Sequence, residues 1–73
     1  MSEVQIVVDR NNVDRNGLRD IAAAVVDAGA ITVEVDEEHH VLTATLPAAA
    51  VHIVTAMEGV RYVRSVMTYY RAA

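Results

Sequence analysis

The spacing of apolar residues along this chain changes from every second residue to helical spacing and back, twice over. From Val4 to Val8 every second residue is apolar, which predicts a strand. After a polar loop, apolar residues return at the spacing of one helix face, at Leu18, Ile21, Ala22, Val25 and Ala28. We expect Asn12 or Asn16 to cap the start of this helix and Gly29 to end it in a left-handed conformation.

The same change of period is repeated in the second half of the chain. Residues 31–36 and 41–46 alternate as strands do, and the polar residues between them predict a hairpin. Pro47 suits the first turn of a helix, because its missing N–H costs nothing there. The apolar stripe of that helix is predicted to comprise Ala50, Ile53, Val54 and Met57. Gly59 is predicted to end this helix, and residues 60–68 are predicted to form a last strand.

This order of elements predicts a fold class. Strand, helix, strand, strand, helix and strand, joined by right-handed crossovers, give an α+β, ferredoxin-like βαββαβ sandwich. Two helices then cover one face of a four-stranded antiparallel sheet, and residues 1–73 form a single domain. The chain has no cysteine, so its small core depends on aliphatic packing, to which its 53% of hydrophobic residues is suited.

Charge and hydropathy argue against two classes of partner. Ten acidic residues outnumber six basic ones and there is no Trp or Phe, which argues against nucleic-acid binding. The longest nearly apolar stretch, residues 21–30, is about half as long as a membrane helix and contains Asp27. We therefore expect no membrane partner. As given, the chain is predicted to be cytoplasmic, or extracellular if it is cut from a secreted precursor.

A sheet with both helices on one side has a second, uncovered face. Its predicted residues include Glu34, Val41, Thr43 and Thr45, with Thr32 and Val7 beside them. Threonine, charge and isolated valines on one face fit either a protein-docking surface or an ordinary solvated one. Both interpretations remain open at this point.

Metal binding is not predicted. Residues 12–17 resemble the front of a calcium loop, but the last ligand position is Ala23, where the ion needs a bidentate carboxylate. His39 and His40 are adjacent and would point to opposite faces of a strand. His52 is predicted on the outer face of the second helix, because Ile53 and Val54 are expected to face inward.

Catalysis is not predicted either. Neither Ser2 nor Ser65 has a base beside it in the pattern, and the three glycines are isolated at the ends of elements instead of forming a phosphate loop. We expect a protein that is not an enzyme and needs no cofactor.

All three tyrosines lie at the C-terminal end, near arginines. Tyrosine and arginine are enriched in protein interfaces, and extended peptides bind by adding a strand. The tail is therefore a predicted recognition peptide, comprising Tyr69, Tyr70, Arg71, Ala72 and Ala73. The alternative is that Tyr62 packs on the sheet and the tail tyrosines are half exposed.

Four short segments resemble a known family. They are residues 29–33 (Gly-Ala-Ile-Thr-Val), residues 43–46 (Thr-Ala-Thr-Leu), Ala50-Val51 with Val54, and residues 58–63 (Glu-Gly-Val-Arg-Tyr-Val). The first two look like the glycine-led second strand and the third strand of subtilisin-like protease propeptides, a family that includes standalone peptidase inhibitors. The others look like that family's Ala-Val-x-x-Leu helix and its closing Pro-Gly-Val-x-Tyr-Val.

The resemblance implies a function. Family members have the same order of elements, pack the open sheet face on two protease helices and lay the C-terminal tail in the substrate cleft like a cleaved product. Residues 70–73 would then fill the four pockets before the cleavage site, with the aromatic Tyr70 in the outermost. One difference is Arg64-Ser65-Val66, which stands where the family usually carries acidic residues. The implied function is a propeptide-like inhibitor or folding chaperone of a subtilisin-type serine protease.

The fold alone leaves another function open. A non-catalytic ferredoxin-like oligomerisation or regulatory domain would use the same open face for self-association. A small-ligand sensor of this fold is a third interpretation. The predicted partner is thus a subtilisin-like protease or a second copy of the chain.

Overall fold

The computed structural model of the protein describes residues 1–65 and has six elements in the predicted order. They are β1 (Ser2–Val8), α1 (Arg15–Asp27), β2 (Thr32–Asp36), β3 (Val41–Leu46), α2 (Ala48–Thr55) and β4 (Val60–Ser65). The bounds of β3 match the prediction, and β2 begins one residue later than predicted. The last strand was predicted to reach residue 68, and residues 66–68 lie outside the described part of the chain.

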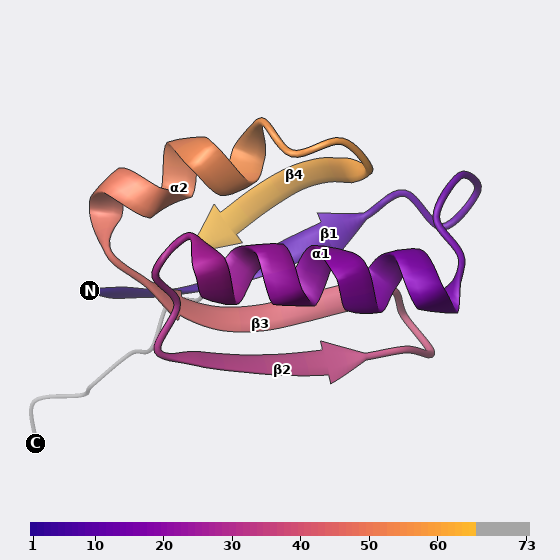
Figure 1. Ribbon diagram of the computed structural model, residues 1–73, viewed down its shortest axis with the longest axis horizontal. Helices are drawn as coiled ribbons and strands as arrows, with labels where there is room; N and C mark the ends of the chain where they lie inside the picture. Colours follow the sequence, from indigo (N-terminus) through magenta and orange to yellow (C-terminus); the bar gives the residue numbers. More distant parts are fainter. Residues whose placement is uncertain (66–73) are drawn as a thin grey trace, which may run out of the picture.

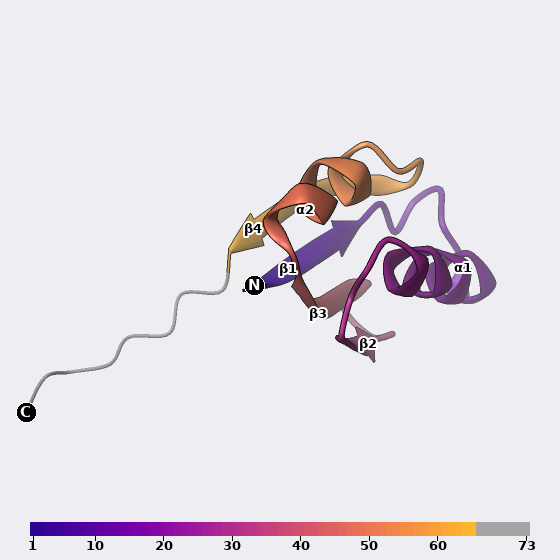
Figure 2. The ribbon, with the colours of Figure 1, turned by 60° about the vertical axis from the view of Figure 1, so that its left-hand side comes forward.

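The four strands form one sheet in the order β2-β3-β1-β4, and each neighbouring pair is antiparallel. Both helices lie on the same side of this sheet, α1 toward β2 and α2 toward β4 (Figures 1 and 2). The predicted α+β, ferredoxin-like fold is confirmed.

The core fills the space between the sheet and the helices. Every second residue of β1 and β3 points into it, since successive side chains of a strand alternate between faces. Its buried members are Val4, Ile6, Val8, Leu18, Ile21, Val25, Leu42, Ala44, Leu46, Ala50 and Val54. Among residues 1–65, no polar or charged side chain is buried, so this layer depends on aliphatic contacts.

Helix α1 buries the predicted stripe, but the predicted N-terminal cap was wrong. The cap is Asp14, whose Oδ1 accepts the backbone N–H of Gly17 at 2.8 Å. A side-chain oxygen at the cap reaches the N–H three residues on, and the observed helix starts at Arg15. Asn12 lies too early for this and instead donates its Nδ2 to Asp9 Oδ2 at 2.6 Å.

The predicted end of α1 is confirmed. Gly29 has φ +117°, a backbone conformation that residues with a Cβ rarely adopt. Its N–H donates to the carbonyl of Val26, and the N–H of Ala30 donates to that of Val25. This pair of bonds satisfies the last carbonyls of the helix and turns the chain toward β2.

Helix α2 is shorter than predicted and turned differently about its axis. Ala50 and Val54 are buried as predicted, whereas Ile53 is 55% exposed and Val51 packs against the core in its place. All these side chains are apolar, so the sequence did not specify which side would face inward. The helix ends at Thr55, and Gly59, with φ +90°, lies in the turn before β4. Neither helix within residues 1–65 has the length and apolar character required to cross a bilayer.

Candidate protein-binding face

The face of the sheet opposite the helices is not covered by any described element (Figure 2). We call it the open face. The strand registers and the alternation of side chains assign its residues, which are Glu3, Gln5, Val7, Thr32, Glu34, Asp36, Val41, Thr43, Thr45, Tyr62 and Arg64. None of them is fully buried, and on β1 and β3 they alternate with fully buried residues.

The strand registers arrange these side chains in three rows across the sheet. The first row contains Thr32, Thr45 and Glu3. The second, which we call the polar row, contains Glu34, Thr43, Gln5 and Arg64 in that order. The third contains Asp36, Val41, Val7 and Tyr62, and its last three members form what we call the apolar row. The open face therefore has the apolar row beside the polar row, and the polar row has opposite charges at its two ends.

Side-chain hydrogen bonds hold two of the rows in place. Thr32 Oγ1 donates to Thr45 Oγ1 at 3.1 Å across β2 and β3. Arg64 Nε donates to Gln5 Oε1 at 2.7 Å across β4 and β1. The second bond fixes the guanidinium over the face and leaves its two terminal nitrogens for another acceptor.

Tyr62 reaches the open face because β4 is irregular. Val60 pairs with Val8 and Tyr62 pairs with Val7, so Arg61 is an extra residue in β4. Without this bulge, alternation would place Val60 and Tyr62 on the same side of the sheet. Val60 instead packs against the core, and Tyr62 is 45% exposed on the open face.

The turn between β2 and β3, residues 37–40, lies at one edge of the open face and carries charged side chains. Asp36 accepts hydrogen bonds from the N–H of His39 at 3.1 Å and from its ring Nδ1 at 2.8 Å. The hydrogen bond with His39 lowers the pKa of Asp36, and the same bond, reinforced by the Asp36 charge, raises the pKa of His39. The two groups thus favour their charged forms in each other's presence.

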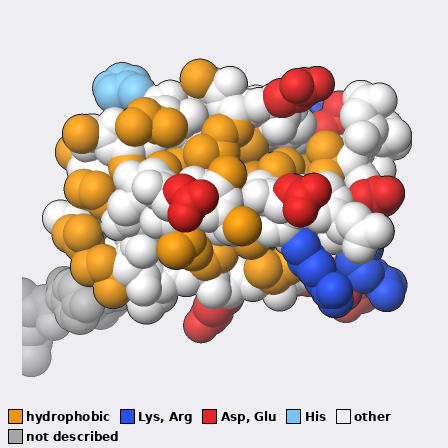
Figure 3. All heavy atoms as spheres, in the orientation of Figure 1, with side chains coloured by type: hydrophobic (Ala, Val, Ile, Leu, Met, Phe, Trp, Pro, Cys, Tyr) orange, Lys and Arg blue, Asp and Glu red, His pale blue; other side chains and the backbone are white. Residues whose placement is uncertain are grey.

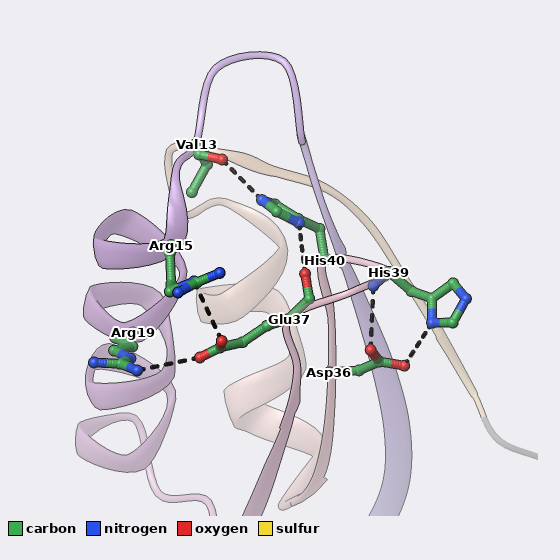
Figure 4. A network of polar contacts seen from close by, with 7 residues as sticks. All are labelled: Val13, Arg15, Arg19, Asp36, Glu37, His39 and His40. Carbon is green, nitrogen blue, oxygen red and sulfur yellow. Dashed lines mark hydrogen bonds and ion pairs between the residues drawn. The ribbon is translucent and has the colours of Figure 1, made fainter.

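The same turn is tied to the start of α1 on the helix side (Figure 4). Glu37 forms ion pairs with Arg15 and Arg19, each at 3.3 Å. His40, at φ +54°, places one ring nitrogen 3.0 Å from the carbonyl of Val13 and the other 3.1 Å from that of Glu37. A neutral imidazole donates to only one of these oxygens, whereas the protonated ring donates to both.

The sequence placed its four candidate sheet residues correctly in space. Glu34, Val41, Thr43 and Thr45 all lie on the open face, and Glu34 is the direct neighbour of Thr43. Their role in binding remains a prediction. The predicted tail, Tyr69 to Ala73, lies outside the described residues. Tyr62 and Arg64 also lie on this face, which strand alternation alone does not predict because their placement depends on the bulge at Arg61.

The segment that resembled a calcium loop has a structural role. Asp14 caps α1, and the side chain of Asn12 and the backbone N–H of Asn11 donate hydrogen bonds to Asp9, which lower its pKa. The loop borders an open hollow of about 540 Å³ that also involves Arg10 and Glu58. In the described part of the chain, no three His, Cys, Asp or Glu side chains are grouped to hold a metal ion.

The two serines and His52 of the described residues lie on three different elements, β1, β4 and α2. Ser65 pairs with Val4 at the end of β4, and Val4 offers no base. Ser2 pairs with Leu46, which offers none either. His52 lies exposed on α2, as predicted, although the expected reason was wrong because Ile53 does not face inward.

The helix side offers a less ordered surface than the open face. Val26, Ile31 and Ile53 are each more than half exposed there, but they come from α1, the connection before β2, and α2 respectively. Figure 3 shows acidic side chains among the apolar ones on this side, and basic side chains gathered at one end. Single exposed apolar residues are common on protein surfaces and indicate no site by themselves.

Comparison with known proteins adds no functional information. No protein-family model matches the chain, and no curated protein or solved structure matches it. A functional assignment therefore depends on the geometry described above.

Proposed function

We propose that this protein is a non-catalytic, propeptide-like inhibitor or folding chaperone of a subtilisin-type serine protease. The observation that carries the proposal is the open face, a four-stranded surface that no described element covers and that has an apolar row along one side. A rigid sheet presents this surface ready-made, so binding orders few groups and loses little entropy.

Tyr62 is the expected anchor of this contact. It is the one aromatic residue among residues 1–65, it is half exposed, and it continues the row formed by Val7 and Val41. Tyrosine in such a position supplies a large apolar area with a polar tip, which is why it is frequent among the residues that dominate binding energy.

The tail is expected to complete the contact. β4 is an edge strand of the sheet, and residues 66–73 follow it directly. A peptide continuing an edge strand is suited to lie extended in a substrate cleft and to pair its backbone with the cleft walls. Arg64, near the end of β4, is positive where the family it resembles is usually acidic, so we expect an acidic surface on this target.

The first experiment is a titration of the full chain against a subtilisin-type protease, following residual hydrolysis of a chromogenic peptide. Two variants test the two parts of the contact: deletion of residues 69–73, and Tyr62→Arg on the open face. Each is expected to weaken inhibition by about tenfold or more, because each removes a contact of the bound state. Refolding of the denatured protease with the chain tests the chaperone role in parallel.

Ile53→Arg is the matched control, because it places the same charge on a similarly exposed apolar residue of the helix side. It is expected to leave inhibition unchanged. The proposal fails if the wild-type chain in large molar excess neither inhibits the protease nor promotes its refolding. It also fails if Ile53→Arg weakens inhibition as much as Tyr62→Arg does.

A second candidate function is a non-catalytic oligomerisation or regulatory domain. The observation that favours it is the pair of opposite charges at the two ends of the polar row. This arrangement suits contact with a second copy.

A further inference from the structure

The polar row is complementary to itself. Glu34, on the edge strand β2, stands at one end and Arg64, on the edge strand β4, stands at the other. The neutral Thr43 and Gln5 lie between them. When the polar row of a second copy is placed against this one in the reverse order, each charged end meets the opposite charge.

Among the two-fold axes that lie in the plane between two open faces, two keep the strands of the copies aligned. An axis perpendicular to the strands places each strand over its own copy. If it crosses the polar row, it opposes Glu34 to Glu34 and Arg64 to Arg64, which is repulsive. An axis parallel to the strands, between β1 and β3, reverses the strand order, so β2 faces β4 and β3 faces β1 of the second copy.

We infer that the open face binds a second copy of this chain about the two-fold axis that runs parallel to the strands. In this arrangement Glu34 opposes Arg64 of the second copy, and the reverse pair forms on the other side of the axis. Val41 opposes Val7, which covers the centre of the apolar row. Asp36 opposes Tyr62, whose hydroxyl is a suitable donor to a carboxylate.

Both charged ends of the polar row, Arg64 and Glu34, are placed favourably for this contact. Arg64 is held across the face by its 2.7 Å bond to Gln5, so its side chain loses less freedom on binding. Glu34 is exposed in the middle of β2, next to Thr43. Two aligned sheets pack with their strands within about 30° of each other, which keeps the two polar rows facing along most of their length.

The area of the face sets the strength of the pair. Four strands of about six residues cover about 20 by 20 Å, or about 400 Å² on each copy. The total of about 800 Å² is below the roughly 1,200 Å² of stable specific interfaces, so the pair is weak and exchanges readily. The inference requires the open face of the proposed function but not the protease. In the free protein, the second copy covers the apolar row. A larger partner that binds the open face would displace this copy.

Sedimentation equilibrium of the full chain tests the inference, from about 10 μM to about 1 mM, a range suited to a small interface. The wild-type chain is expected to dimerise within this range. Glu34→Arg and Arg64→Glu are each expected to raise the dissociation constant by about tenfold or more, because each creates two like-charge contacts in the dimer. The double variant, with both charges exchanged, is expected to return within about threefold of wild type.

The controls separate charge pairing from other effects. Asp27→Arg makes the same change of net charge as Glu34→Arg, but on the exposed side of α1, and is expected to leave the dissociation constant within about threefold. Circular dichroism confirms that each variant is folded. A chain that stays monomeric at every concentration overturns the inference, as does a double variant no better than the single ones.

The protease titration gives an independent result. Inhibition by a strictly monomeric chain would refute the self-association alone. Dimerisation that follows the charge exchange, without any effect on the protease, would refute the proposed function and leave this inference standing.

Discussion

The two faces of the sheet are built from the same strands and differ in almost every other respect. On β3, Leu42, Ala44 and Leu46 are at most 1% exposed, whereas the intervening Val41, Thr43 and Thr45 remain partly accessible. Every buried side chain of the covered face among the described residues is apolar, while the open face has both signs of charge and an ordered apolar row. The comparison indicates that one face supplies stability and that the other is available for recognition.

The sharpest test of this division compares adjacent residues of β3. Leu42→Ala removes a fully buried side chain and is expected to cost about 2–5 kcal/mol of unfolding free energy, a large part of the total for a small domain. Thr43→Ala, one residue away on the open face, is expected to change it by less than about 0.5 kcal/mol. Urea denaturation followed by circular dichroism measures both. Similar losses in the two variants would contradict the division between the faces.

A second test compares two glycines on the helix-covered side, one in the turn before β4 and one at the end of α1. Gly59 has φ +90°, and an added Cβ would lie 2.8 Å from Val13 Cγ2 and 3.2 Å from Ile21 Cδ1. Gly29 has a similarly unusual φ of +117°, but its Cβ would meet only Pro47, at 3.6 Å. Gly29→Ala is therefore expected to cost about 1 kcal/mol from backbone strain, and Gly59→Ala about 1–3 kcal/mol more from overpacking. Equal denaturation midpoints for the two variants would show that the space around Gly59 adjusts without cost.

The covered face is also the part of the molecule that the sequence predicts best. The order of elements and the stripe of α1 follow from apolar periodicity, because burying these residues allows few alternatives. Prediction was weaker where every side was apolar, as in α2, in which Ile53 was expected inside and is exposed. It was also weaker where several residues offered the same chemistry, as at Asp14, which caps α1 in place of Asn12 or Asn16.

The open face could be predicted only in part. Glu34, Val41, Thr43 and Thr45 were placed correctly, because simple alternation holds along β2 and β3. The contributions of Tyr62 and Arg64 depend on the extra residue Arg61, and no local pattern indicated that bulge. The opposition of Glu34 to Arg64 across the sheet is a property of the register between four strands, so no single segment contains it.

The two faces should also respond differently to pH, which gives the smallest predicted effect. The core has no titratable group among residues 1–65, so the titratable groups of the described residues lie outside it, among them Asp36, at the edge of the open face, and His39 beside it. The pKa of His39 is raised by its hydrogen bond to Asp36, so its contribution to stability is present below its unfolded pKa and is lost as pH rises through the folded value. The pKa of Asp36 is lowered by the same bond, so its contribution is present above its unfolded pKa and is lost as pH falls.

The Asp36–His39 pair should therefore stabilise the fold between about pH 4 and about pH 6.5, where both groups are charged. His39→Gln is expected to lower the urea midpoint slightly in this window and to converge with wild type at alkaline pH, where His39 has lost its proton. Asp36→Asn keeps an acceptor for the N–H of His39 but removes the charge, so it should abolish the pH dependence of the His39→Gln effect. NMR titration of the Asp36→Asn variant should show the pKa of His39 falling toward its ordinary value, because the hydrogen bond to the Asp36 carboxylate is the main cause of the raised pKa. A His39→Gln effect that persists unchanged above pH 8 would indicate that the turn depends on side-chain packing and not on the ion pair.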